Sequence, residues 1–278
     1  MRTLSLGFSP CPNDTFLFYP LLHGRITSET FRFAERLEDV ETLNHLALEG
    51  TLDVCKVSYH AFAYIREQYV LLRSGGAMGK GCGPLLVSKT ADNPQDLKGK
   101  TIAVPGRYTT AFLLLRLFDP TLTNLVVLPF HEIVPAVEQG TVDAGVIIHE
   151  SRFTYLSHGL RKVLDLGEWW ETTTSLPLPL GGIAAKRSLG APALTTLSGV
   201  VRSSVVYARA HPGETSGYVR AHSQEMDEET CASHIALYVN DYSLDPGPEG
   251  EQAAERLFAQ GERIGLLPPS NAPLFVPL

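Results

Sequence analysis

The residues best suited to chemistry lie where predicted strands end. His149 follows the apolar run 142–148, which is rich in β-branched residues and does not alternate, as expected of a parallel strand covered on both faces. In open α/β sheets, ligands bind beyond the carboxyl ends of the strands. A histidine has an unperturbed pKa of about 6.5 and acts as a base near neutral pH. We therefore predict that His149 is a catalytic base, although a histidine beside an apolar run is more often structural.

The same pattern occurs once earlier, at an offset of 90 residues (140 − 50). Gly50-Thr-Leu-Asp53 matches Gly140-Thr-Val-Asp143, and the segments before both matches carry an apolar i, i+3, i+4 stripe. Each match is typical of a helix, a glycine that ends it, and a strand. The earlier strand ends on Lys56, Val57 and Ser58. The repeat predicts two similar α/β halves whose strand ends meet at one cleft.

A third candidate segment is Ser9-Pro-Cys-Pro-Asn-Asp14, between a predicted strand over 3–8 and a helix over 16–22. Asn13 or Asp14 would cap this helix. Alternatively, the N–H groups gathered at the helix start would hold a carboxylate or hydroxyl of a ligand. We include both residues among the candidate substrate contacts and leave open whether Cys11 or Asp14 assists the chemistry.

Composition and charge exclude several classes of protein. The chain has 278 residues, 44% hydrophobic and 19% charged, as in an ordinary globular protein. A net charge of −7 argues against nucleic acid or an anionic membrane as a partner. The four cysteines show no C-x-x-C spacing, so neither a metal site nor a disulfide framework is predicted. The N-terminal segment has no signal-peptide pattern and no apolar run approaches a membrane span, so we expect a cytoplasmic protein.

The predicted elements begin with strands over 3–8, 31–37 and 53–58, separated by helices over 16–22 and 41–49. This β-α-β-α-β order predicts a parallel sheet with right-handed crossovers. The glycine-rich segment 75–83 lacks the spacing of a nucleotide-binding loop and is interpreted as a loop near the cleft. Helices over 198–211, 215–224, 228–239 and 248–264 would complete the first half.

The start of the second half carries a specific resemblance. Leu97-Lys-Gly-Lys-x-Ile-Ala-Val104, followed by a small-polar turn that opens a helix, is similar to the second domain of periplasmic-binding-protein-like (type II) proteins. The resemblance implies an α/β fold of two domains, each a mostly parallel sheet flanked by helices, with a ligand cleft between them. Domain 1 would comprise 1–88 and 187–278, and domain 2 would comprise 89–186. Thr109 and Thr110 would sit where such proteins hold an anionic ligand.

Three motifs narrow the resemblance. Phe8-Ser-Pro-Cys-Pro-Asn-Asp-Thr-Phe16, Lys56-Val-Ser-Tyr59 and Ile147-Ile-His-Glu150 together resemble the 1,4-dihydroxy-6-naphthoate synthase family of the futalosine route to menaquinone. The likeness covers essentially the whole chain. It implies a small-molecule substrate, the carboxylated cyclic dehypoxanthinyl futalosine, which loses its sugar-derived portion as the naphthoate ring aromatises, and it implies no cofactor.

The resemblance also implies roles for individual residues. By position, His149 would be the proton acceptor, and the substrate contacts would be Lys56, Val57, Ser58, Thr109 and Thr110. No role is expected for the other histidines. The adjacent Trp169 and Trp170 would either stack on a flat ring or pack in the core.

Two other functions remain open at this point. The first is a chorismate dehydratase of the same pathway, which shares the fold. The second is a non-catalytic protein that captures a small anion in the cleft. The sequence leaves the oligomeric state open.

Overall fold

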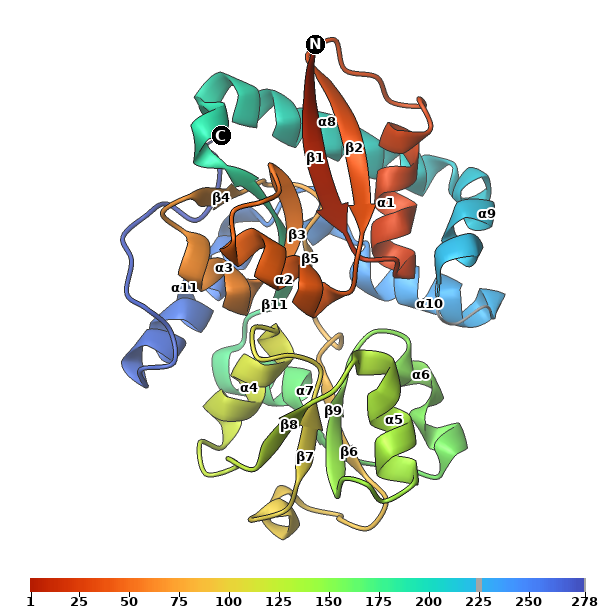
Figure 1. Ribbon diagram of the computed structural model, residues 1–278, viewed down its shortest axis with the longest axis vertical. Helices are drawn as coiled ribbons and strands as arrows, with labels where there is room; N and C mark the ends of the chain where they lie inside the picture. Colours follow the sequence, from red (N-terminus) through yellow and green to blue (C-terminus); the bar gives the residue numbers. More distant parts are fainter. Residues whose placement is uncertain (224–226, 278) are drawn as a thin grey trace.

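The computed structural model describes residues 1–223 and 227–277 and shows two α/β lobes joined by crossing segments (Figure 1). Each lobe is built around its own sheet. This confirms the predicted α/β fold with a parallel core in each half. Residue 224, the last of the second predicted C-terminal helix, lies outside the described residues.

The sheet of the first lobe has the strand order β2-β1-β3-β11-β4, with β5 paired to β11. Strand β1 is parallel to both β2 and β3, as the predicted β-α-β-α-β order requires, whereas β11 is antiparallel to β3, β4 and β5. The bounds are Arg2–Phe8 (β1), Phe31–Leu37 (β2), Val54–Ser58 (β3), Tyr69–Leu71 (β4), Ala77–Gly79 (β5) and Leu178–Lys186 (β11).

The sheet of the second lobe has the order β10-β6-β9-β7-β8. Strand β7 is parallel to β8 and β9, and β6 is antiparallel to β9 and β10. The bounds are Leu85–Ser88 (β6), Ile102–Val104 (β7), Leu125–Val127 (β8), Ala144–Ile147 (β9) and Arg161–Asp165 (β10). Read from the opposite end, this order matches the first sheet strand for strand along its main path.

The structure confirms the internal repeat in detail. Gly50 and Gly140 both adopt left-handed backbone, with φ of 67° and 73°, where a helix gives way to a strand. The Asp53 carboxylate accepts a hydrogen bond from the Ser5 N–H, and the Asp143 carboxylate accepts one from the Thr101 N–H, each on the neighbouring strand segment. The repeated Gly-Thr-x-Asp therefore ends the helix and fixes the register of the following strand.

Helices cover both sheets and end in short connections. In the first lobe they are α1 (Pro12–Leu22), α2 (Val40–Leu48), α3 (Tyr59–Ile65), α8 (Ala191–Ala210), α9 (Pro212–His222), α10 (Glu228–Tyr238) and α11 (Gly247–Arg263). In the second they are α4 (Thr110–Phe118), α5 (Phe130–Glu138), α6 (Ser151–Thr154) and α7 (Leu166–Thr174). Short 3-10 helices span Pro94–Leu97, Tyr155–His158, Arg187–Leu189 and Asp241–Ser243. Among the described residues, no helix combines the length and apolar content needed to cross a bilayer.

Strand pairing changes the predicted domain boundaries. The division into 1–88 plus 187–278 and 89–186 assigned β6 to the first domain and β11 to the second. Instead, β6 pairs with β9 of the second sheet and β11 pairs with β3 of the first. The chain passes from the first lobe into the second at β6 and returns at β11, and each of these strands is the antiparallel member of its sheet. We therefore propose boundaries just before β6 and just before β11.

Core packing explains two other features of the sequence. Trp170 is fully buried and its indole N–H donates to the Pro177 carbonyl, while Trp169 packs edge-on against Phe118. Neither tryptophan lines the central cavity, so the packing interpretation is correct. Helix α1 packs against α8, α9 and α10, which places α10, from the last quarter of the chain, beside the segment that follows β1.

Candidate active site

One cavity brings together all the side chains proposed from the sequence. It has an empty volume of about 700 Å³, part of it open to solvent. The cavity lies where β3 and β9 end at the junction of the lobes. The predicted residues on its lining are Asn13, Asp14, Lys56, Val57, Ser58, Thr109, Thr110 and His149.

His149 follows β9 in an uncommon backbone conformation. Its φ is 55°, in the left-handed region that a side chain with a Cβ adopts at a cost of about 1–2 kcal/mol. The imidazole packs against Phe130, with ring centroids 4.9 Å apart. Although the residue is half-buried, its Nε2 is enclosed and has no hydrogen-bond partner within the described chain. The strained turn thus holds, on the cavity lining, a histidine with an unpartnered ring nitrogen.

Burial sets the protonation state of this imidazole. Desolvation lowers the pKa of His149, and the negative charges of Glu150 and Asp14 oppose part of that effect. A pKa below the usual value keeps the ring neutral near pH 7, which is the form that accepts a proton. The position and the environment both suit a general base.

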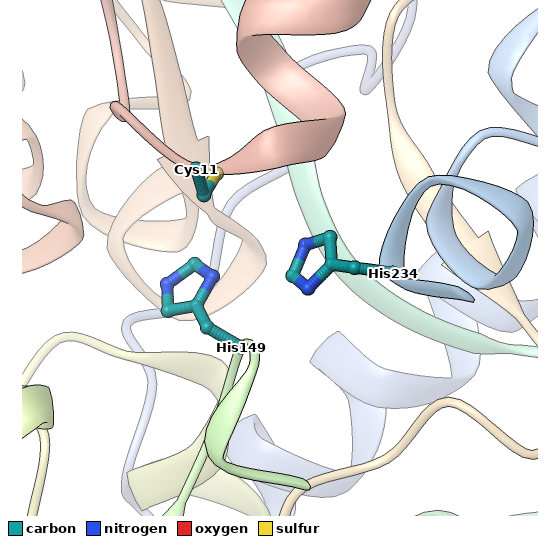
Figure 2. Close-up of side chains that lie close together, drawn as sticks. All are labelled: Cys11, His149 and His234. Carbon is teal, nitrogen blue, oxygen red and sulfur yellow. The ribbon is translucent and has the colours of Figure 1, made fainter. Parts of the chain in front are cut away.

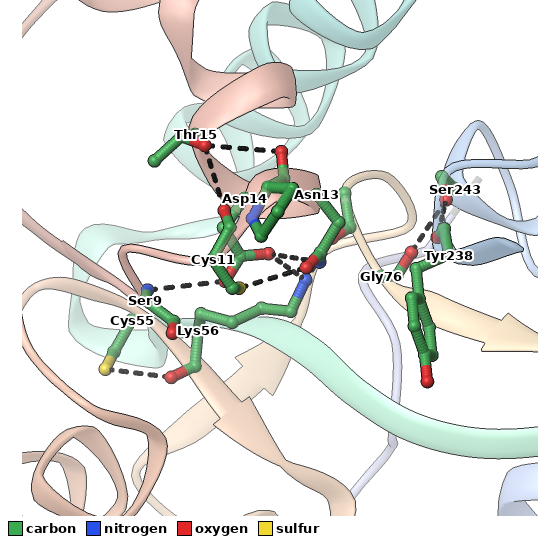
Figure 3. Close-up of polar contacts among 12 residues, drawn as sticks. Ser9, Cys11, Asn13, Asp14, Thr15, Cys55, Lys56, Gly76, Tyr238 and Ser243 are labelled. Atoms are coloured by element: carbon green, nitrogen blue, oxygen red, sulfur yellow. Dashed lines mark hydrogen bonds and ion pairs between the residues drawn. The ribbon is translucent and has the colours of Figure 1, made fainter. Parts of the chain in front are cut away.

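Lys56 is the centre of a buried polar network (Figure 3). Its Nζ lies 2.8 Å from Asp14 Oδ1 and donates to the Gly75 carbonyl at 2.9 Å. Asp14 also accepts hydrogen bonds from the Asn13 side chain and the Ser9 N–H. Lys56 and Asp14 are 6% and 1% exposed, so the lysine charge is largely balanced within the protein. This pairing was not foreseen, because we predicted Lys56 only as a contact for substrate.

The hydroxyls of Thr109 and Thr110 also make hydrogen bonds within the protein. Thr109 caps α4 by accepting from the Phe112 N–H, and its hydroxyl donates to the Gly106 carbonyl. The Thr110 hydroxyl donates to the Leu180 carbonyl. Both hydroxyls therefore position the start of α4, and any direct contact with a ligand falls to backbone groups there.

Backbone donors remain available at the start of α4. The N–H groups of Thr110 and Ala111 make no hydrogen bond within the described residues, and both residues line the cavity. Helices α1 and α3 also begin beside the cavity, at Pro12 and Tyr59. The capping residues Cys11, Ser58 and Thr109 of these three helices all line the cavity, and the partial positive charge at a helix start favours an anionic ligand.

Ser58 keeps one hydrogen-bond donor free. Its N–H donates to Asn44 Oδ1, and its hydroxyl oxygen accepts from Asn44 Nδ2 at 3.2 Å. The Ser58 hydroxyl proton stays available for a ligand. Asn44 comes from α2 and orients this serine at the end of β3.

Sequence reasoning missed His234. This residue lies on α10, is completely buried, and lines the cavity. Its ring is nearly parallel to that of His149, at 12° and with centroids 6.1 Å apart. The Nε2 atom bonds to Asn13 Oδ1 at 2.9 Å, so it carries the proton and leaves Nδ1 as the acceptor. No local signal marks His234, because its neighbours on α1 are more than two hundred positions away in the chain.

Comparison with known proteins agrees with this geometry. A family model described as menaquinone biosynthesis matches residues 4–263. A 1,4-dihydroxy-6-naphthoate synthase of Thermus thermophilus is 54% identical, over 99% of this chain and 100% of its own. A protein of the same name from Streptomyces coelicolor is 48% identical, over 96% and 95% of the two chains.

Solved structures agree on the fold. A protein from Archaeoglobus fulgidus superposes with a TM-score of 0.90 at 36% identity, over 95% of this chain and 98% of its own. The alkanesulfonate-binding protein SsuA from Xanthomonas axonopodis pv. citri, bound to MOPS, superposes with a TM-score of 0.71 at 14% identity, over 97% and 95%. The second match shows the periplasmic-binding-protein-like fold alone. On the sequence matches, the chain belongs to the menaquinone biosynthesis family that includes the two naphthoate synthases.

Proposed function

We propose that this protein is a 1,4-dihydroxy-6-naphthoate synthase that converts cyclic dehypoxanthinyl futalosine to 1,4-dihydroxy-6-naphthoate in menaquinone biosynthesis. The observation that carries the proposal is the unpartnered Nε2 of His149 in a cavity lined by all the predicted contact residues. The two synthase relatives at 54% and 48% identity support the same reaction.

Substrate binding follows from the electrostatics of the cavity. The free N–H groups of Thr110 and Ala111 at the start of α4 would hold the substrate carboxylate. Asp14 neutralises Lys56, so the lysine contributes one remaining N–H rather than an unbalanced positive charge. Val57 would contribute through its backbone at the end of β3.

The reaction begins with proton transfer to His149. Its neutral imidazole accepts a proton from a hydroxyl of the sugar-derived portion, opening the cyclic hemiacetal or creating an alkoxide. In a retro-aldol-like step, the alkoxide becomes a carbonyl as the adjacent carbon–carbon bond breaks, and the electron pair moves into the ring system. The Ser58 hydroxyl and the Lys56 ammonium would stabilise the resulting oxyanion. Aromatisation of the naphthoate ring then makes the cleavage favourable, and His149 returns the proton.

The experiment is incubation of the purified protein with cyclic dehypoxanthinyl futalosine, followed by absorbance and mass of the product. Wild type should release dihydroxynaphthoate. A parallel incubation with chorismate should show no loss of the enolpyruvyl group. Turnover of chorismate would identify a dehydratase, and binding without turnover of either compound would identify an anion-binding protein.

A further inference from the structure

Cys11, His149 and His234 form a compact cluster that the proposed reaction uses only in part. The Cys11 sulfur and one ring nitrogen from each histidine all lie within 4.8 Å of one another. Figure 2 shows His149 rising from the second lobe toward Cys11 and His234 of the first. Thiolate sulfur and imidazole nitrogen are the ligands preferred by Zn²⁺ and similar cations.

Both histidines of the cluster have a buried ring nitrogen that no hydrogen bond in the described part of the chain uses. Within the described residues, His149 Nε2 and His234 Nδ1 are buried and have no hydrogen-bond partner. Leaving such atoms unpaired costs free energy. The other ring nitrogen of His234 bonds to Asn13 Oδ1, which is the type of outer contact that orients a histidine ligand of a metal.

We propose that Cys11, His149 and His234 bind a thiophilic divalent cation such as Zn²⁺, which joins the two lobes and blocks the active site. Binding breaks the Cys11 S–H bond, the sulfur electron pair goes to the metal, and the proton leaves to solvent. The blocking effect rests on the proposed role of His149 as base, because the imidazole that should accept the proton then ligates the metal. The metal site itself does not depend on that role.

The geometry requires a small closure of the cleft. Ligand atoms of a tetrahedral zinc site are roughly 3.3–3.6 Å apart, given metal–ligand bonds of about 2.0–2.3 Å. The separations of up to 4.8 Å in the cluster therefore have to shorten by about 1 Å. Cys11 and His234 belong to the first lobe and His149 to the second, so a slight approach of the lobes supplies this movement. The metal would then stabilise the closed form.

Cobalt is the probe for this site, because a thiolate bound to Co²⁺ gives a charge-transfer absorption in the near ultraviolet. The reduced full-length wild type should bind one Co²⁺ with this band and melt at a higher temperature. Cys11→Ser should lose the band, and His234→Gln should bind Co²⁺ at least tenfold more weakly. The matched control is Cys82→Ser, which removes another buried cysteine of the same cavity that is not in the cluster.

Three results would overturn the site: no band in wild type, a full band in Cys11→Ser, or equal loss of the band in Cys82→Ser. Circular dichroism of the metal-free variants checks their folding, and Cys11→Ala provides a second test if the serine variant is unstable. Zn²⁺ should also inhibit turnover by wild type, at concentrations at least tenfold lower than for His234→Gln. If the protein bound Co²⁺ but Zn²⁺ did not inhibit turnover, the metal site would stand and only the proposed block of the active site would be overturned. If the protein had no synthase activity, the charge-transfer band would still test the metal site.

Discussion

Replacing Asp14 by Asn should destabilise the protein strongly, because it leaves the Lys56 charge buried without a counter-charge. The two groups lie 2.8 Å apart, with side chains 8% and 2% exposed. Breaking a buried ion pair by removing one partner costs about 3–5 kcal/mol. At 2–4 °C per kcal/mol for a chain of this size, a cost of 3 kcal/mol lowers Tm by about 6–12 °C.

A matched exposed pair provides the control. Arg161 and Asp92 are also 2.8 Å apart, but their side chains are 59% and 67% exposed. Asp92→Asn should therefore change the free energy of unfolding by at most about 1 kcal/mol. The double substitution Asp14→Asn/Lys56→Met removes both buried groups and should recover most of the loss.

Urea unfolding followed by circular dichroism measures all of these variants. If Asp14→Asn cost no more than Asp92→Asn, the buried lysine would not depend on its partner. If the double variant were as unstable as Asp14→Asn alone, the loss would come from the Asn13 and Ser9 contacts of Asp14 rather than from an unpaired charge.

Other perturbations test other parts of the structure. Burial lowers the pKa of His60 to about 4. The unfolded chain therefore binds a proton at this histidine before the folded protein does, and the free energy of unfolding should fall as pH drops from 6.5 towards 4, by up to about 3 kcal/mol. His60→Asn should flatten that part of the pH–stability curve, and an unchanged curve would contradict the shift. Gly83→Ala should cost about 1–3 kcal/mol in urea unfolding, because its Cβ would lie 2.3 Å from the Gly167 backbone, whereas Gly199→Ala, in an open helical position, should stabilise by about 0.5–1 kcal/mol. Equal effects of the two would refute the close approach. Exhaustive treatment with a chelator should leave turnover intact, and loss of activity restored by a metal would contradict a cofactor-independent reaction.

The sequence predicts the local order of this fold well, since hydrophobic periodicity and glycine stops are local signals. The repeat around Gly50 and Gly140 identified both strand ends that line the cavity. The strands β4 and β5 were missed, because both are only three residues long and β5 also lies in a glycine-rich segment interpreted as a loop. The segments of β6 and β11 were interpreted as strands that cross between the halves, but each was assigned to the wrong half, because an apolar strand has the same pattern in either sheet.

The site shows the same division between local and long-range information. His149 could be proposed because it directly follows its strand. The Asp14–Lys56 pair joins residues 42 positions apart, and the His234–Asn13 bond joins residues 221 apart. Only the packing of α10 against α1 brings His234 to the cavity. From residue type alone, Lys56 and Asn13 were therefore predicted to contact substrate, whereas in the folded protein they pair with Asp14 and His234.

The most direct test of the central claim is the turnover of cyclic dehypoxanthinyl futalosine by wild type, His149→Ala and His149→Gly. Wild type should form dihydroxynaphthoate, while both variants should lose about 10²–10⁴-fold of the rate that a general base supplies. Added imidazole should restore part of the activity of His149→Gly, whose left-handed backbone at this position also suits glycine. Full turnover by His149→Ala would contradict the assignment of His149 as the base.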